Sequence, residues 1–365
     1  MQRILRVLLL ILLLAVPRLI LAQGVTTASI SGIVTDDQGQ PVPGASVMAV
    51  HTPSGTKYGT STQLDGRFYV RGLRVGGPYV ITVSGVGYKT QEVRDVNLEI
   101  GQNLEMNFKL TVQAVSVGGV EIIAERNALM NTNRTGAATT VSRRFIETFP
   151  TITRSFADFE SLTPQMVGNS ALGRNNRYNN IQLDGTNYND LFGLPSNGTP
   201  GGQAGTTPIS LDAIQEFQVT LAPFDVRQGG FTGAEVNAIT RSGTNQFRGS
   251  VYFFGQNQNF VGTSPDTLKT PYPNFSNVQT GFRLGGPIVQ DKLFFFVNGE
   301  ITRRRQPLYN TMPVADSVIQ RFNSIMSGYG LSPGSYNTYT LLQPSNKLFV
   351  RLDYNISETN KLTIR

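Results

Sequence analysis

The chain has 365 residues, no cysteine, 15% charged residues and a formal net charge of +7. Charged residues are scarce against about 25% in ordinary soluble domains, and 38 glycines favour a β-rich, loop-rich chain. The absence of cysteine excludes a small disulfide-stapled scaffold. Basic residues are scattered, with runs only at Arg143-Arg144 and 303–305, so we expect no nucleic-acid binding, which needs a basic face.

Residues 1–22 have the layout of a cleavable secretory signal. Arg3 and Arg6 form a basic start, 5–16 is an almost unbroken apolar run, and Ala22 precedes a plausible cleavage point at Gln23. The apolar run is shorter than the roughly 20 residues that span a bilayer, which disfavours the alternative of an anchor helix. No later segment offers such a run, so a membrane location would require a β-barrel.

Residues 23–113 are predicted to form a seven-stranded β-sandwich. Short alternating segments follow one another between turns rich in Gly, Pro and Asp, without a helical period. These segments are 30–34, 42–50, 67–70, 79–83, 89–93 and 104–110. Tyr79, Ile81 and Val83 occupy every second position and are expected to form one inward face.

Several short motifs run through this region: Ser31-Gly32, Val34-Thr35-Asp36, Gly39, Pro41, Pro43-Gly44-Ala45, Asp65-Gly66, Phe68 and 85–88. Together they resemble the regulatory-like domain that accompanies zinc carboxypeptidases. The resemblance is to this non-catalytic partner, and the residues agree. Zinc hydrolysis needs three protein ligands, usually including histidine, and His51 is the single histidine of the chain. Since His51 is followed by a Pro/Ser/Gly loop, we expect it at the surface.

Residues 114–128 are predicted to be a connector. Within it, Val120–Ala124 is a short β-prone stretch, and the preceding Gly118-Gly119 would let it detach without strain. The alternative interpretation is that this stretch is the last strand of the sandwich.

Residues 129–244 are predicted to form an α+β domain. Helical character is expected at 142–149 and 156–162, and a short helix at 212–217 leads into a strand. A polar stretch rich in Gly and Asn lies between them, from 173 to 180.

Three motifs in this domain resemble the plug of TonB-dependent outer-membrane receptors. They are Leu183-Asp184-Gly185, 209–219 and 233–241. The segments 236–252 and 285–296 most resemble the Oar-like receptors, and 221–224 departs from the Arg-Gly-Pro that usually follows the second motif. The resemblance implies that Val120, Glu121, Ile122, Ile123 and Ala124 are the TonB box. It also implies a ligand-facing plug loop, placed at Arg174, Asn175, Asn176, Arg177 and Tyr178.

Residues 245–365 are predicted to be the first four to five strands of a large transmembrane antiparallel β-barrel. Apolar and polar positions alternate in 247–253, 278–284, 293–301 and 348–356. Phe247, Val251 and Phe253, for example, oppose Ser250 and Tyr252. Long and short connections also alternate, as in outer-membrane barrels. A soluble sandwich would share the first pattern but has no reason for the second.

The chain stops inside a fifth alternating run, 361–365. So few strands cannot close a barrel, and lipid cannot satisfy the open edge. Plugged outer-membrane transporters have about 22 strands. The expectation is therefore a mainly β chain, composed of a β-sandwich, an α+β plug and a truncated barrel, that forms the N-terminal part of a longer receptor.

The residues favour no catalytic group, no metal site and no cofactor. With one histidine and no cysteine, the usual nucleophile–base pairs are not available. Asp184, Asn187, Asn189 and Asp190 crowd oxygens that would suit Ca²⁺. Their spacing matches no known calcium loop, so a solvated turn is the preferred interpretation.

The resemblance implies energised import across the outer membrane, with the sandwich in the periplasm. The implied partners are TonB with its inner-membrane energising complex, an extracellular nutrient and outer-membrane lipid, with a surface lipoprotein as a further candidate. Peptides or glycans are expected as nutrients ahead of siderophores. The alternative is an adhesion or secretion-associated barrel, with the sandwich as a carbohydrate-binding module.

Overall fold

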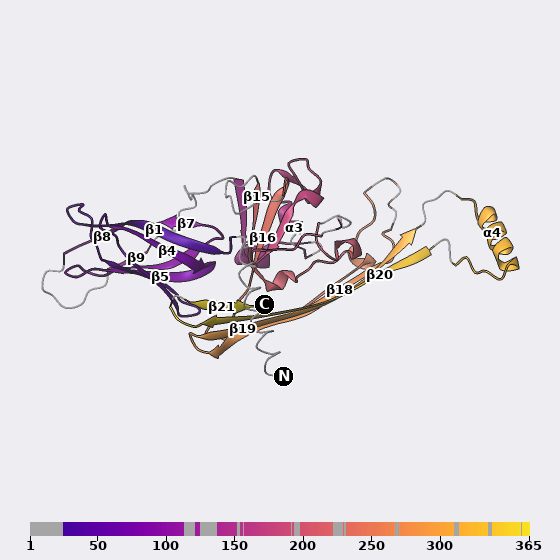
Figure 1. The fold of residues 1–365 in the computed structure, drawn as a ribbon. Helices are drawn as coiled ribbons and strands as arrows, with labels where there is room; N and C mark the ends of the chain where they lie inside the picture. Colours follow the sequence, from indigo (N-terminus) through magenta and orange to yellow (C-terminus); the bar gives the residue numbers. More distant parts are fainter. Residues whose placement is uncertain are drawn as a thin grey trace, which may run out of the picture.

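The structure is a computed structural model. It describes residues 25–112, 121–124 and 137–365, without positions 152–153, 156, 191, 193–197, 222–228, 230, 266, 268, 270, 310–313, 335–337 and 359. The signal predicted at 1–22 lies outside the described residues, as do Val120 and most of the connector. The described elements form a sandwich, a central plug and a sheet of long strands (Figure 1).

The sandwich (25–112 with 121–124) consists of two β-sheets. One contains β1 (Thr27–Asp36), β4 (Arg67–Arg74), β7 (Asn103–Glu105) and β8 (Phe108–Leu110). The other has the order β3 (Thr56–Ser61), β2 (Ser46–His51), β5 (Gly76–Ser84), β6 (Gln91–Leu98), β9 (Glu121–Ala124). Because β7 and β8 pair in succession with β1, they count as one interrupted strand. The predicted seven strands are then present, with β9 as an additional edge strand.

The space between the two sheets is filled by apolar side chains. Tyr79, Ile81 and Val83, the predicted inward face, are fully buried, and they share one cluster with Ile30 and Leu73 of the facing sheet. The sequence pattern does not predict β3, because its residues are mostly polar and it lies at a sheet edge, where only one neighbour constrains it.

The plug comprises the described residues between 137 and 241. Its sheet has the order β10 (Ala137–Ser142), β15 (Ile214–Leu221), β16 (Ala234–Thr240), β13 (Asn180–Leu183), β14 (Thr186–Asn187). Smaller elements are α2 (Arg143–Thr148), α3 (Ala157–Glu160), β11 (Met166–Val167), β12 (Ser170–Ala171), η2 (Asn176–Tyr178), η3 (Gly202–Ala204) and η4 (Leu211–Ala213).

The central strand of the plug is β16, and every one of its residues is buried. This agrees with the prediction of a plug strand at 233–241. The helix predicted at 212–217 is wrong in extent. Only the single turn η4 is helical, and β15 begins at Ile214 because pairing with β16 extends the strand toward the turn.

The last part of the chain is an antiparallel sheet in chain order, the barrel sheet. Its strands are β17 (Arg248–Asn257), β18 (Ser276–Val289), β19 (Leu293–Tyr309), β20 (Thr338–Asn355) and β21 (Lys361–Ile364). The long connections contain η5 (Gln258–Phe260) and α4 (Asp316–Gly328). Phe247, Val251 and Phe253 are exposed on one face, while Ser250 and Tyr252 on the other face contact the plug. The predicted alternation is confirmed.

Two strands are longer than the alternation predicts, since β19 has 17 residues and β20 has 18. Their pairing continues to Tyr309 and Thr338, past the apolar segments. Outside the hydrocarbon, water satisfies polar side chains on both faces, so a hairpin can continue without apolar alternation.

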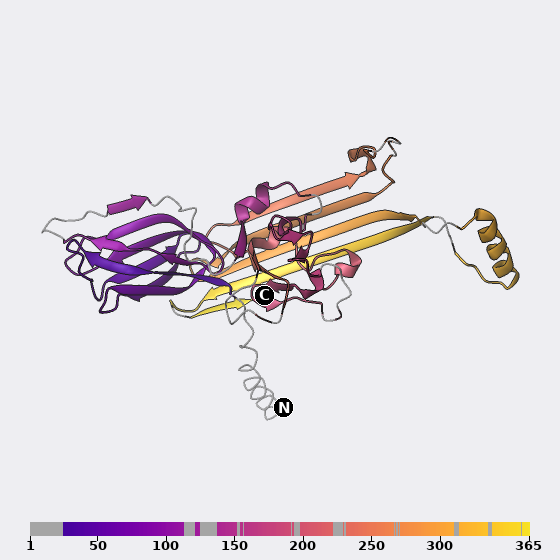
Figure 2. The ribbon, with the colours of Figure 1, turned by 90° about the horizontal axis from the view of Figure 1, so that it is seen from above.

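The sandwich lies at the end of the barrel sheet where the short turns are, and α4 lies at the opposite end (Figure 2). The plug lies over one face of the barrel sheet, beside the sandwich (Figure 1). Among the described helices, none has the length and apolar character needed to cross a membrane.

Candidate functional site

Three clusters of polar and charged side chains connect the plug to the barrel sheet, beside an apolar contact in which Phe296 of β19 lies in the core of the plug. We name each cluster after its central carboxylate: Glu300, Asp212 and Asp353. The strand register orders them, because Asp353 lies near the short turns, Arg283 of the Asp212 cluster follows, and Glu300 is farthest along the strands.

The Glu300 cluster joins four barrel strands to the plug. Glu300 is 2% exposed. Its Oε2 accepts hydrogen bonds from the Tyr252 hydroxyl (2.7 Å), Gln279 Nε2 (2.8 Å) and Ser210 Oγ of the plug (2.8 Å). Its Oε1 lies 2.7 Å from Lys347 Nζ. A buried carboxylate with this many donors is stabilised in its charged form. Glu300 therefore attaches the plug to the barrel sheet, and removing its partners would leave a buried charge unpaired.

The Asp212 cluster lies between the plug helix α2, the end of β16 and the barrel strand β18. Arg283 Nη1 of the barrel sheet lies 2.7 Å from Asp212 Oδ1, and its Nη2 lies 3.5 Å from Glu147 Oε1. Arg241, 4% exposed, lies 3.2 Å from the same Glu147 oxygen and donates through Nε to the Ile214 carbonyl. Two plug carboxylates therefore hold one barrel arginine.

Charge crowding in this cluster shifts the pKa values of its members. Burial, together with the neighbouring charges of Arg283 and Arg143, lowers the pKa of Arg241 to about 10. Burial by itself would raise the pKa of Glu147, but hydrogen bonds and charges from Arg143 and Arg241 outweigh it and lower that pKa. Both groups stay charged at neutral pH, and the cluster is ionic.

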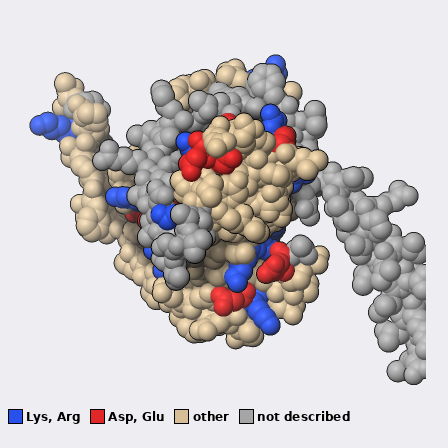
Figure 3. Space-filling model, turned by 90° about the vertical axis from the view of Figure 1, so that its left-hand side faces the viewer, with Lys and Arg blue, Asp and Glu red and all other residues tan. Residues whose placement is uncertain are grey.

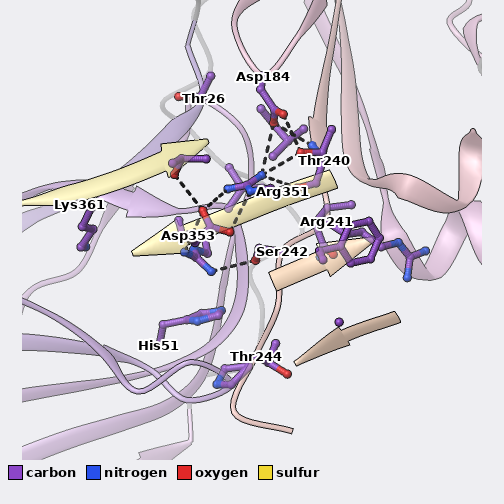
Figure 4. Close-up of a pocket in the computed structure, with 18 of the residues that line it drawn as sticks. Thr26, His51, Asp184, Thr240, Arg241, Ser242, Thr244, Arg351, Asp353 and Lys361 are labelled. Carbon is purple, nitrogen blue, oxygen red and sulfur yellow. Dashed lines mark hydrogen bonds and ion pairs between the residues drawn. The ribbon is translucent and has the colours of Figure 1, made fainter. Parts of the chain in front are cut away.

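The Asp353 cluster joins all three parts of the chain (Figure 4). Arg351 of β20 makes two 2.9 Å bonds to Asp353 and donates through Nη1 to the Thr240 carbonyl and hydroxyl of the plug, each at 2.9 Å. Asp184 accepts from the Thr240 N–H (2.9 Å) and hydroxyl (2.6 Å). Arg74 of the sandwich lies 3.6 Å from Asp353. A planar guanidinium suits this bridging role because it has five donors in a fixed geometry.

A cavity of about 340 Å³ adjoins the Asp353 cluster. It is lined by residues of the sandwich, the plug and the barrel sheet, including His51, Arg74, Ser242 and Lys361 (Figure 4). At the sandwich end of the molecule, basic and acidic side chains are interspersed over the surface (Figure 3). Within the described residues, no group of three or more His, Asp or Glu side chains is arranged to hold a metal ion.

The predicted TonB box is placed on the sandwich. Glu121–Ala124 forms β9, which pairs in parallel with Gln91–Arg94 of β6, and Val120 lies outside the described residues. Asp95, with φ of 61°, follows at once, and the register with β9 ends at Arg94. Both interpretations of the stretch, coupling segment and sandwich strand, remain compatible with this pairing.

The predicted ligand-facing loop lies in the plug around η2. Arg174, Asn175, Arg177 and Tyr178 are exposed, and Asn176 is half-buried. Asn175 Oδ1 accepts the Arg177 N–H and caps the turn. The structure does not join this loop to the three ionic clusters through any described hydrogen bond or ion pair.

Two expectations from the sequence are wrong. His51 is not at the surface: it is 5% exposed, its Nδ1 lies 2.7 Å from Ser54 Oγ, and its ring packs on Tyr79. His51 is the last residue of β2 and does not lie in a loop. It occupies an inward position in the alternation of that strand and is therefore buried. Asp184 is not solvated, although it has a turn backbone with φ of 49°, because Thr240 and Arg351 cover its carboxylate.

Sequence reasoning places the cluster residues on the correct face but does not find the clusters. Tyr252, Glu300, Arg351 and Asp353 all lie on the polar side of the predicted strands. Alternation assigns a side chain to a face, whereas the pairing of strands decides which side chains meet, and that pairing is not local.

Two known protein domain families match parts of the chain. The carboxypeptidase regulatory-like domain family matches residues 29–111. The outer membrane beta barrel domain family matches residues 239–341. The TonB-dependent transporter Oar of Myxococcus xanthus is 26% identical over 290 residues, which cover 74% of this chain and 26% of the relative. The chain is therefore a homologue of this transporter that contains a carboxypeptidase regulatory-like domain and part of an outer membrane beta barrel domain.

The solved structures that the chain matches include a siderophore receptor and an outer membrane transporter. The siderophore receptor PirA from Acinetobacter baumannii is 17% identical, with 63% of this chain and 31% of that chain covered and a TM-score of 0.39. The outer membrane transporter YddB from Escherichia coli is 12% identical, with 60% and 31% covered and a TM-score of 0.43.

The chain spans about a quarter of the length of the curated relative that it matches. That relative is a transporter. TonB-dependent receptors as a class work with TonB and bind extracellular ligands.

Proposed function

We propose that this receptor imports a nutrient across the outer membrane by a plug rearrangement that TonB drives from the periplasm. The supporting observation is the attachment of the plug to the barrel sheet. Buried carboxylates and arginines hold it, as in the bonds of Arg351 to Thr240 and of Ser210 to Glu300. Such bonds are strong while formed and can be exchanged for bonds to water, which suits a plug that must move and return. Apolar contact with the barrel sheet is also present, since Phe296 of β19 lies in the apolar cluster of the plug.

The coupling segment in this proposal is Val120–Ala124. Its described part, β9, is the edge strand of its sheet and forms backbone pairs with β6, so it can present the same backbone groups to another sheet. Recognition by strand addition depends on main-chain hydrogen bonds more than on side chains. TonB would therefore take β9 from β6, a contact of only four residue pairs.

The proposed cargo is a peptide or glycan rather than a siderophore. The exposed side chains of Arg174, Asn175, Arg177 and Tyr178 offer hydrogen-bond donors, acceptors and one aromatic ring, the groups that bind amides and sugar hydroxyls. The proposed division is a signal at 1–22, a periplasmic sandwich at 23–113, a connector at 114–128, the plug at 129–244 and barrel strands from 245.

The test uses the full-length receptor in a strain that lacks its own copy. Cells are grown with casein peptides as the nitrogen source or maltodextrin as the carbon source, at limiting concentrations. We expect growth to depend on the receptor with at least one of the two, and Ile122→Pro to abolish that growth, because proline removes a backbone donor and restrains the preceding residue. Ile122→Val is the matched control and should grow normally.

Normal growth of the Ile122→Pro strain would reject Val120–Ala124 as the coupling segment. If growth on neither nutrient depends on the receptor, and deletion of the receptor makes the cells lose attachment to a surface, the adhesion alternative is favoured.

A further inference from the structure

The sandwich contacts the plug through a buried interface. Val75 and Ile100 of the sandwich form an apolar cluster with Ile239 of the plug, and all three are at most 7% exposed. The Ile100 N–H donates to Glu216 Oε1 at 2.8 Å, and the Ile100 carbonyl accepts from Gln218 Nε2 at 3.2 Å. Both backbone groups of this buried residue therefore depend on the plug, and separation would leave them without partners unless water entered.

Burial also sets the charge state of this interface. It raises the pKa of Glu216 to about 8, against the opposing effect of the hydrogen bond from Ile100. At neutral pH the carboxyl is therefore largely neutral, which a dry interface requires.

The contacts of the sandwich with the barrel sheet are of a different kind. Asn355 Nδ2 donates to Thr56 Oγ1 at 3.1 Å, and Arg74 lies 3.6 Å from Asp353. Lys361 Nζ lies 3.1 Å from the centroid of the Tyr58 ring, and this lysine is exposed. The Asn245 N–H, just before β17, also donates to the Pro53 carbonyl at 2.8 Å, and both residues are half-buried, where water can replace the bond. We call these four contacts the rim contacts.

The Arg74–Asp353 and Asn355–Thr56 contacts can break without leaving any of these side chains without a partner. Asp353 keeps its two bonds to Arg351 and one to Thr363, while Arg74 keeps its 2.8 Å bond to Ser242 of the plug. Asn355 keeps a 2.9 Å bond to the Asp291 carbonyl, and Thr56 keeps Ser54. The cost of a broken hydrogen bond is mainly that of leaving a buried group unsatisfied. Since each of these four side chains keeps another partner, breaking the two contacts leaves no such group.

From this contrast we propose that the sandwich and the plug form one body, and that the rim contacts are a releasable latch between that body and the barrel. The inference rests on the proposed function, because it concerns what moves when the plug moves. When TonB pulls, the sandwich leaves the rim together with the base of the plug. In the resting state it returns and closes the short-turn end of the barrel beneath the plug.

Cysteine pairs test the proposal cleanly, because the chain has no cysteine of its own. The latch pair is Thr56→Cys with Asn355→Cys, and the body pair is Ile100→Cys with Gln218→Cys. A second body pair, Val25→Cys with Asn237→Cys, lies where Asn237 Nδ2 donates to the Val25 carbonyl at 2.6 Å, and it serves if the first variant fails to fold. Each pair is introduced into the full-length receptor in living cells supplied with casein peptides and maltodextrin.

The measurement is the yield of disulfide after a brief oxidant pulse, read as a gel shift, in energised cells and in cells treated with a protonophore. We expect energised cells to show a yield at least twofold lower for the latch pair and an unchanged yield for the body pair. A fall in the body pair, or no change in either pair, would overturn the proposal.

A strain without TonB separates this result from the proposed function. If the latch pair still opens there while the body pair stays closed, the sandwich and plug are one body but TonB is not the driver. If both pairs behave alike in every strain, the division into body and latch is wrong.

Discussion

The sandwich core and the plug–barrel interface are both built from β-strands, but they are stabilised in opposite ways. Between the sandwich sheets lie apolar side chains such as Ile81 and Leu73, which are fully buried. Between the plug and the barrel sheet lie Glu300, Asp353 and Arg351, which are also buried, but charged. Apolar burial favours one permanent arrangement, whereas ion pairs have acceptable alternatives in water. Under the proposed function, the comparison predicts that the sandwich core stays folded while the plug–barrel interface separates.

The largest effect is expected when the Glu300 cluster loses its charge. Glu300→Gln leaves Lys347, whose side chain is 14% exposed, without a carboxylate, and losing one partner of a buried ion pair costs about 3–5 kcal/mol. The urea midpoint at which a protease cuts the plug of the full-length receptor should fall accordingly. Adding Lys347→Met should recover most of the loss, because no buried charge then remains alone. An unchanged midpoint for Glu300→Gln would show that this cluster does not hold the plug.

A somewhat smaller loss is expected in the apolar region. In the isolated sandwich (25–112), Ile81→Ala should lower the free energy of unfolding in urea by about 3 kcal/mol, since it leaves a cavity among fully buried neighbours. Leu64→Ala is the matched control, because Leu64 is 90% exposed, and it should change stability by less than about 0.5 kcal/mol. Equal effects of the two substitutions would contradict the assignment of the core.

The sandwich buries one imidazole, that of His51, which makes its stability depend on pH. Burial, with the charge of Arg74, lowers the pKa of His51 from 6.5 to about 3. The unfolded chain therefore binds a proton that the folded sandwich does not bind between these pH values. Stability is fully present above pH 6.5 and is lost as the pH falls toward 3, at about 1.4 kcal/mol per pH unit from this group. His51→Gln should reduce the pH slope of the unfolding free energy by that amount, and an identical slope would refute the buried neutral state.

The sequence predicts features that depend on local periodicity and leaves out those that depend on long-range pairing. The outward positions of Phe247 and Val251 follow from alternation, and the inward position of Tyr79 follows in the same way. The meeting of Ser210 with Glu300, 90 positions apart, follows from no local pattern. Likewise α4 is not predicted, because it lies in a connection that periodic strands do not constrain.

The central claim is that the plug must separate from the barrel wall for import. Thr206 Oγ1 of the plug and Ser345 Oγ of β20 lie 2.7 Å apart, so Thr206→Cys with Ser345→Cys should form a disulfide that locks them together. Ser46→Cys with Ser84→Cys joins two paired strands within the sandwich and is the control. Receptor-dependent growth on casein peptides or maltodextrin should be lost in the oxidised lock, return with dithiothreitol, and be unaffected in the control. Normal growth with the plug fully cross-linked to the wall would contradict the account.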